Sequence, residues 1–337
     1  ADLDVYNEDI EGSFSGIGIR FNTITDTITV DEVISGGPSE KVGILPGDRI
    51  VTVNDSVIAG KKISNEQIIK RLRGKKGSKV KLGIKRDNSS SLLHFTVTRD
   101  DIPVTSVDAS YMIHDATGYL KINKFSTETY REFLTSLASL RQQGARQFIL
   151  DLRGNGGGLM EAAVKMANEF LQRESTIVSM KGRKPEYNTS FPADGLGSFT
   201  NENIVVLIDE ASASASEILA GAIQDNDRGL IIGRRSFGKG LVQNQIDLPD
   251  HSSIRPTVAR YYTPSGRCIQ KTYSHGDIGG YANEIVDRYM HGEGFNADSI
   301  RVDKSQIFHT TGGRTVYGGG GIIPDIFVPN DTLGISD

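Results

Sequence analysis

The chain has 337 residues, a formal net charge of −4 and 37% hydrophobic residues. This length predicts two domains, or one large domain with an appendage, and the small net charge gives no indication of a nucleic-acid partner. The one cysteine, Cys268, excludes an internal disulfide, and no residues have the spacing of metal ligands. We therefore expect neither a metal nor another cofactor.

No apolar run reaches the roughly 18 residues of a membrane-spanning helix, so an integral membrane protein is not expected. The first residues, Ala-Asp-Leu, show no signal-peptide pattern. We expect residues 1–12 to be the remnant of an N-terminal segment.

Short strands and two small helices are predicted for about the first hundred residues. Residues 17–21 alternate apolar with polar or small side chains, as in a half-buried strand. A capping box from Ser64 to Gln67 starts a helix that ends at Gly74. Apolar residues at 80–84 and 93–97 predict a closing hairpin. Residues 13–99 are therefore expected to form a compact β-rich domain.

After residue 103, predicted strands and helices alternate, which is typical of a largely parallel sheet. Ser126 is expected to cap a helix that ends before Gly144. Buried strands are predicted at 148–150, 204–208 and 230–232, and helices after the glycine run at 154–158 and over 215–223. Residues 275–315 look polar and irregular. We expect residues 100–337 to form an α/β core with a C-terminal extension.

Three serines stand where the second of these helices begins: Ser212, Ser214 and Ser216. A helix N-terminus presents unpaired N–H groups and partial positive charge, the environment that a tetrahedral oxyanion requires. Serine is also favoured there as a capping residue. The serines alone therefore leave both interpretations open.

Lys239 supplies a candidate base for such a serine. No histidine lies between His114 and His251, and a lysine can accept the proton of a serine if burial keeps the amine neutral. An exposed, solvated lysine is the ordinary alternative.

Two other motifs pass through the same lysine. Residues 233–239 match G-x-x-x-x-G-K, but Gly240 stands where a phosphate-binding loop needs Ser or Thr, and 241–242 look extended rather than helical. Ser236 and Lys239 match S-x-x-K, but Gly238 and Gly240 disfavour the helical turn that would join them. Both alternatives are disfavoured.

Two glycine-containing stretches are further candidates. Residues 153–158 follow a buried strand, and their backbone N–H groups could donate a second oxyanion hydrogen bond, although tight strand–helix packing would explain them equally. At the start of an earlier strand, Gly16, Ile17, Gly18 and Ile19 could hold a peptide carboxylate, with the strand edge accepting the peptide by β-augmentation. The basic run over 70–81 is interpreted as a solvated face.

Seven motifs resemble those of the carboxyl-terminal processing peptidases, also called tail-specific proteases, and they follow one another in the order typical of that family. The region from about Ser13 to Thr98 resembles a PDZ domain. The motifs are SGIGI at 15–19, SEKVGILPGDRIVTVN at 39–54, DLRGNGGG at 151–158, SASASEILAGAIQD at 212–225, FGKGLVQ at 237–243, YYTPSGRCIQ at 261–270 and GGGGIIPDI at 318–326.

This resemblance implies a crotonase-like α/β peptidase core behind an N-terminal PDZ domain. It places the nucleophile on Ser214, the base on Lys239, and on Gln243 the residue that holds the lysine amine. The oxyanion hole would use the amides of Ala215 and Gly157. Residues 209–211 read Asp-Glu-Ala where related sequences often read Asn-Glu-Gly. The resemblance also implies a helical segment before the PDZ domain. In this sequence, only about twelve residues precede that domain.

The sequence therefore predicts a serine endopeptidase that captures protein C-termini through its PDZ domain and cleaves nearby through an acyl-enzyme. A peptide-binding scaffold on an inactive peptidase fold is the alternative, and a phosphate-loop ATPase is a third. Arg73, at the end of the helix beside the peptide groove, is expected to couple the PDZ domain to the core. Expected partners are proteins or peptides with accessible C-termini, and a homo-oligomer is left open. The family resemblance implies an extracytoplasmic location, in the periplasm or cell envelope.

Overall fold

A computed structural model describes residues 13–87, 89–103, 105–249, 252–273 and 278–331. The chain divides into two compact units, residues 1–104 and 105–337. Residues 100–103, which the sequence analysis grouped with the core, lie in unit 1 because strand β8 (Asp100–Pro103) pairs with β1 (Ser13–Gly16). The expected segment 1–12 lies outside the described residues.

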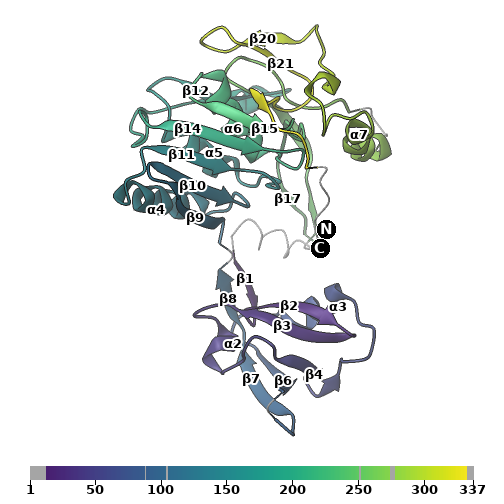
Figure 1. Ribbon diagram of the computed structural model, residues 1–337. Helices are drawn as coiled ribbons and strands as arrows, with labels where there is room; N and C mark the ends of the chain where they lie inside the picture. Colours follow the sequence, from purple (N-terminus) through teal and green to yellow (C-terminus); the bar gives the residue numbers. More distant parts are fainter. Residues whose placement is uncertain (1–12, 88, 104, 250–251, 274–277, 332–337) are drawn as a thin grey trace. The chain divides into compact units, whose positions relative to one another are not determined.

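The described residues of unit 1 form a β-rich domain with two short helices, as the sequence predicts (Figure 1). Its antiparallel sheet has the order β2-β3-β4-β6-β7, and β5 pairs with β4. The core is apolar and contains Ile17, Ile50, Val80 and Val97. The remaining elements are β2 (Ile19–Ile24), β3 (Thr27–Val33), α2 (Pro38–Lys41), β4 (Arg49–Val53), β5 (Ser56–Val57), α3 (Asn65–Leu72), β6 (Lys79–Lys85) and β7 (Leu93–Thr98).

The predicted capping box starts α3. Ser64 is the N-cap, its hydroxyl accepts the Gln67 N–H at 3.3 Å, and the Gln67 side chain accepts the Ser64 N–H. Each of the two groups thereby satisfies a backbone donor that the helix itself leaves unpaired. Ile68 and Leu72, four residues apart, then face the core.

Unit 2 is built on a six-stranded sheet with the order β22-β15-β14-β11-β10-β9. The strands from β10 to β22 along this order pair in parallel, and β9 adds an antiparallel edge. These strands are β9 (Val107–His114), β10 (Thr117–Ile122), β11 (Gln147–Asp151), β14 (Asn203–Ile208), β15 (Leu230–Gly233) and β22 (Ile326–Phe327). The largely parallel sheet confirms the expectation from alternating strands and helices.

A second, antiparallel sheet has the order β13-β12-β19-β16. Helix α6 (Ala215–Asp225) contacts β15 of the first sheet and β12 of the second, and every one of its residues is buried. Its small and apolar composition suits a helix that meets protein on all sides. The strands of this sheet are β12 (Thr176–Gly182), β13 (Thr189–Pro192), β16 (Leu241–Gln243) and β19 (Thr257–Tyr262).

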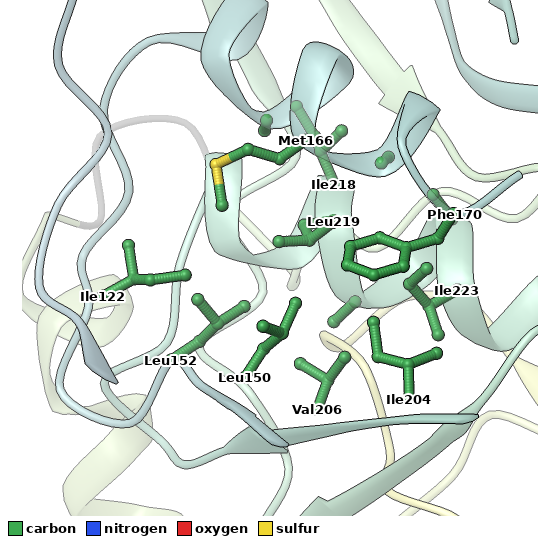
Figure 2. Packing of buried hydrophobic residues seen from close by; sticks show 14 of the residues in the cluster. Ile122, Leu150, Leu152, Met166, Phe170, Ile204, Val206, Ile218, Leu219 and Ile223 are labelled. Carbon is green, nitrogen blue, oxygen red and sulfur yellow. The ribbon is translucent and has the colours of Figure 1, made fainter. Parts of the chain in front are cut away.

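The core of unit 2 lies between the parallel sheet and the helices (Figure 2). Leu150 and Val206 of the sheet meet Leu219 and Ile223 of α6 and Met166 of α5. Two of the helices are α4 (Thr129–Gln142) and α5 (Met160–Asn168). Ser126 was expected to cap α4, but the helix begins at Thr129 with Glu128 as its N-cap. The Ser126 hydroxyl is instead buried beside those of Ser106 and Thr129.

Residues 275–315 are more regular than the sequence analysis predicted. They contain the helix α7 (Ile278–Met290), a 3-10 turn (Ala297–Ser299) and strand β20 (Ile307–His309), which pairs with β21 (Thr315–Tyr317). The expectation of an irregular extension was therefore wrong for this stretch. A further short hairpin joins β17 (Ile246–Asp247) to β18 (Ser253–Ile254), and a 3-10 turn spans Pro185–Tyr187.

Candidate active site

The three segments that the sequence analysis singled out in the core leave the same edge of the parallel sheet. The glycine loop (residues 153–158) follows β11, the serine segment (residues 209–216) follows β14, and the lysine loop (residues 234–240) follows β15. These three strands are consecutive neighbours in parallel register. The carboxyl ends of adjacent parallel strands are the usual place for a site in such a sheet.

The three serines of the serine segment have different hydrogen bonds. The Ser212 hydroxyl donates to the Leu152 carbonyl at 2.8 Å, and the Ser216 hydroxyl donates to the Asn155 carbonyl at 2.9 Å; both serines are fully buried. Ser214 is partly exposed, and its hydroxyl donates no hydrogen bond to any described residue. Ser214 is therefore the serine whose hydroxyl group is available for chemistry.

Ser214 also has an uncommon backbone conformation, with φ 55° and ψ −111°. A positive φ is strained for a residue with a Cβ, and such strain is concentrated at functional sites. The residue forms the sharp turn between the end of β14 and α6, which presents its side chain at the helix N-terminus. Directly after it, the Ala215 N–H has no hydrogen-bond acceptor among the described residues.

Gly157 of the glycine loop lies against this turn. A Cβ at Gly157 would stand 2.6 Å from the Ala213 carbonyl oxygen and 2.8 Å from the Ser214 Cβ, and φ is +101°. Only glycine fits this close approach. The Gly157 N–H, which the sequence analysis placed in the oxyanion hole, donates to the Asn155 side-chain oxygen at 2.9 Å. An oxyanion would have to share this donor with Asn155.

Asn155, which the sequence analysis did not single out as a functional residue, joins the glycine loop to the serine segment. It is fully buried, its side chain donates to the Ile122 carbonyl at 2.8 Å, and its own carbonyl accepts the Ala213 N–H at 3.0 Å and the Ser216 hydroxyl. It was visible only as part of the DLRGNGGG motif, because its role depends on contacts with distant residues.

The glycine loop is fixed at its start by Asp151. This buried carboxylate accepts hydrogen bonds from the Tyr119 hydroxyl at 2.6 Å and the Arg153 guanidinium at 2.6 Å. Burial alone would raise the pKa of Asp151, but the hydrogen bonds from Arg153 and Tyr119 outweigh burial and hold the pKa below its usual value. Burial and the neighbouring carboxylate raise the pKa of Tyr119 to about 12.

The lysine loop runs beside the serine segment. The Phe237 N–H donates to the Ser212 carbonyl at 2.9 Å, which joins the two segments directly. Lys239 is partly buried, and its ammonium group donates no hydrogen bond to a described residue. The structure therefore brings Ser214 and Lys239 onto neighbouring segments, as the Ser-Lys prediction requires.

Glu217, on the first turn of α6, connects these segments through one buried carboxylate. It accepts the N–H groups of Ser214 at 2.8 Å, Gly238 at 2.7 Å and Lys239 at 2.8 Å. It also accepts the hydroxyl of Ser236 at 2.6 Å. Complete burial raises its pKa above the usual value despite these donors. These contacts give Glu217 a supporting role in the site.

Gln243 lies at the end of β16, where it pairs with Thr257 and is exposed. No hydrogen bond joins its side chain to Lys239 or to another described residue, so its predicted role in holding the lysine amine stays a prediction. Strand β16 begins directly after Gly240, where a phosphate-binding loop would open a helix. The Ser236 hydroxyl is buried against Glu217, which leaves the S-x-x-K alternative without a free serine.

In unit 1, the predicted peptide-binding residues span the end of β1, which includes Gly16, and the start of β2, which includes Ile19. The Ile17 side chain is buried in the core, and Gly18 has φ +74° with Ile102 and Pro38 close to where a Cβ would stand. The carbonyl groups of Ile17 and Gly18 accept the N–H groups of Ser39 and Ile34, both at 3.0 Å. Among the described strands, β2 pairs only with β3, so its other edge is open to a peptide strand.

Arg73 is the C-cap of α3, as its predicted position requires, and its N–H donates to the Ile69 carbonyl at 2.8 Å. A buried arginine that the sequence analysis missed, Arg99, holds the same end of the helix. Its guanidinium donates to the carbonyl groups of Leu72 and Arg71, both at 2.9 Å, and burial lowers its pKa. It replaces the hydrogen bonds that the last helical carbonyls lack.

Within the described residues, no group of three or more His, Cys, Asp or Glu side chains is arranged to hold a metal ion. In the same part of the chain, none of the helices has the length and apolar character needed to cross a membrane. Cys268 is a free thiol in partly buried surroundings.

Comparisons with known proteins match each unit to a family. Residues 116–279 match the model of peptidase family S41, and residues 15–98 match the model of the PDZ domain. A probable CtpA-like serine protease of Staphylococcus epidermidis is 34% identical over 313 residues, which cover 93% of this chain and 58% of that protein. A carboxyl-terminal-processing protease of a Picosynechococcus species is 39% identical over 265 residues, covering 77% and 63%.

Among solved structures, the chain is similar to a photosystem II D1 C-terminal processing protease. The identity is 32%, the match covers 77% of this chain and 70% of that one, and the TM-score is 0.45. Of the two sequence relatives named above, from Staphylococcus epidermidis and Picosynechococcus, the chain spans less than two thirds of the length.

Proposed function

Because the chain belongs to peptidase family S41 and carries a PDZ domain, we propose that it is a serine endopeptidase that binds protein C-termini and cleaves near them. The observation that carries the proposal is the difference between the three serines. The hydroxyl groups of Ser212 and Ser216 donate hydrogen bonds to backbone carbonyls. The Ser214 hydroxyl donates none to a described residue, and Ser214 lies in the segment beside the lysine loop.

In the proposed reaction, the Ser214 oxygen attacks the carbonyl carbon of the scissile bond while neutral Lys239 takes the hydroxyl proton. The resulting oxyanion is stabilised by the Ala215 N–H and by an N–H of the glycine loop. When the C–N bond breaks, the Lys239 ammonium returns the proton to the leaving amine. The acyl group stays on Ser214 as an ester. Water, deprotonated by Lys239, then attacks this ester, which releases the acid and restores the Ser214 hydroxyl.

We place the C-terminal tail of the substrate along the open edge of β2, with its carboxylate at the backbone of residues 16–19. A strand edge offers main-chain hydrogen bonds to any sequence, so the tail would be selected by its accessible end and its apolar side chains. From the family resemblance we place the reaction in the periplasm or cell envelope. Fractionation of cells that express the protein would test this location.

The test of the proposed chemistry uses a peptide with an apolar C-terminal tail, with the products identified by mass spectrometry. Ser214→Ala and Lys239→Ala should both abolish cleavage, and a serine-directed acylating probe should label the parent protein at Ser214. Lys165→Ala is the matched control, because Lys165 is exposed on α5 in an ion pair with Glu161. Cleavage by Ser214→Ala at the parent rate would refute the assignment. If the protein binds the tailed peptide but the probe does not label it, the alternative of a peptide-binding scaffold on an inactive peptidase fold is supported.

A further inference from the structure

Helix α7 contacts the lysine loop through a single face. Tyr281, Glu284 and Arg288 are spaced by three and four residues, so they lie on one side of the helix. Arg288 is 8% exposed, and its guanidinium donates to the carbonyl groups of Ser236 at 2.8 Å and Phe237 at 3.3 Å. These are two of the three residues directly before Lys239.

A second contact from the same direction involves Lys271, which is 2% exposed. Its backbone N–H donates to the Gly238 carbonyl at 2.9 Å. Its ammonium group donates to the Tyr281 carbonyl at 2.9 Å and to Glu284 at 3.1 Å, and it lies 4.1 Å from the centre of the Phe237 ring. Glu284 also accepts a hydrogen bond from Arg288. One carboxylate therefore holds both cations.

The backbone of residues 236–239 is consequently held from two sides. Its carbonyl groups at 236, 237 and 238 accept hydrogen bonds from Arg288 and the Lys271 N–H. Its N–H groups at 238 and 239 donate to the Glu217 carboxylate. Glu217 belongs to the helix that carries Ser214, so an inner carboxylate and an outer guanidinium together define where Lys239 stands relative to Ser214.

We infer that Arg288, oriented by Glu284, is a positioning residue for the reaction: it fixes the lysine loop so that the Lys239 amine reaches the Ser214 hydroxyl. This inference rests on the proposed function. Arg288 touches neither substrate nor reacting atoms. Its loss should therefore slow the proton transfer without weakening substrate binding, because the tail and scissile peptide bind elsewhere.

The test measures kcat and KM on a tailed peptide, together with the rate of Ser214 acylation by a small probe. Arg288→Ala should lower kcat and the acylation rate about 10- to 100-fold, the scale expected for a misplacement of about 1 Å, with KM unchanged. Arg288→Lys retains a donor for one carbonyl and should recover part of the loss. Glu284→Gln should give an intermediate loss, because Arg288 keeps its carbonyl acceptors and Glu293, 3.8 Å away, but loses its charged hydrogen-bond partner Glu284.

Arg301→Ala is the matched control, since Arg301 is an exposed arginine that lines the same cavity of about 480 Å³ as Arg288 without contacting the lysine loop through its side chain. It should behave as the parent. The inference is overturned if Arg288→Ala keeps the parent kcat, if it raises KM without lowering kcat, or if Arg288→Lys is no better than Arg288→Ala in a folded protein. If instead Ser214→Ala cleaves at the parent rate, the proposed function itself fails.

Discussion

Ser214 and Lys239 donate their backbone N–H groups to the same carboxylate oxygen, Oε2 of Glu217, at 2.8 Å each. The candidate nucleophile and the candidate base are thus fixed to one another through their backbones, although they stand 25 positions apart in the sequence (239 − 214). The Ser214 hydroxyl and the Lys239 ammonium donate no hydrogen bond to a described residue, as expected of groups that must exchange a proton with a substrate.

Glu217→Gln should weaken the connection between the backbones of Ser214 and Lys239. The substituted amide would direct its own N–H groups toward backbone donors, so hydrogen bonds would be lost in a fully buried place. We expect the free energy of unfolding to fall by about 1–3 kcal/mol and the acylation of Ser214 to slow markedly. Urea unfolding and probe labelling would measure the two effects. Glu161→Gln, on the exposed face of α5, should change neither.

Ser216→Ala tests which serine reacts. The variant loses a buried hydroxyl that donates to the Asn155 carbonyl, while that carbonyl keeps its hydrogen bond from the Ala213 N–H. We expect a loss of about 1 kcal/mol in the free energy of unfolding, with labelling of Ser214 retained. Peptide mapping of the labelled variant would check this. Loss of all labelling in a folded Ser216→Ala protein would contradict the selection of Ser214.

Gly157→Ala should disrupt the turn at Ser214. The new Cβ would collide with the Ala213 carbonyl oxygen, at a backbone angle that alanine disfavours. We expect the free energy of unfolding to fall by about 1–3 kcal/mol and hydrolysis to be lost. Gly156→Ala is the matched control, because no other atom lies within 4 Å of the place its Cβ would take. Equal activity of the two variants would show that the close approach is unimportant.

Asp151 should contribute to the acid sensitivity of the fold. Its pKa in the folded protein is below the ordinary value of 3.8, so its stabilising contribution is present above about pH 4 and is lost as the pH falls through the folded-state pKa. Asp151→Asn should therefore be less stable than the parent at pH 6, and the difference should shrink toward pH 3. Unfolding at the two pH values would measure it. Asp108→Asn, an exposed carboxylate, should show no such difference.

The convergence of the core segments could be predicted from the sequence because it follows from chain order. Apolar strands alternating with helices predict a parallel sheet, and the loops after its strands must then meet at one edge. The glycine loop, the serine segment and the lysine loop do so. The family matches confirm the predicted resemblance to carboxyl-terminal processing peptidases and to the PDZ domain.

Helix α7 could not be predicted in the same way. Gly279 and Gly280 stand in its first turn, where glycine lowers helix propensity, although Tyr281, Ile285 and Tyr289 have helical spacing. Arg288 contacts Ser236 and Phe237, which are about 50 residues away in the sequence. Asn155 and Arg99 could not be identified from the sequence either, because their partners lie in other segments of the chain. Each satisfies backbone groups of another segment, and a sequence pattern does not show which carbonyl groups need a donor.

The turn at Ser214 has a consequence for the evolution of stability in this fold. Glycine adopts φ 55° and ψ −111° with the least strain. For a residue with a Cβ, this backbone conformation costs on the order of 1–3 kcal/mol of folding free energy. The fold alone would favour glycine at position 214, whereas the proposed chemistry requires a hydroxyl. Selection for stability without selection for activity would therefore be expected to replace the candidate nucleophile, Ser214, by glycine.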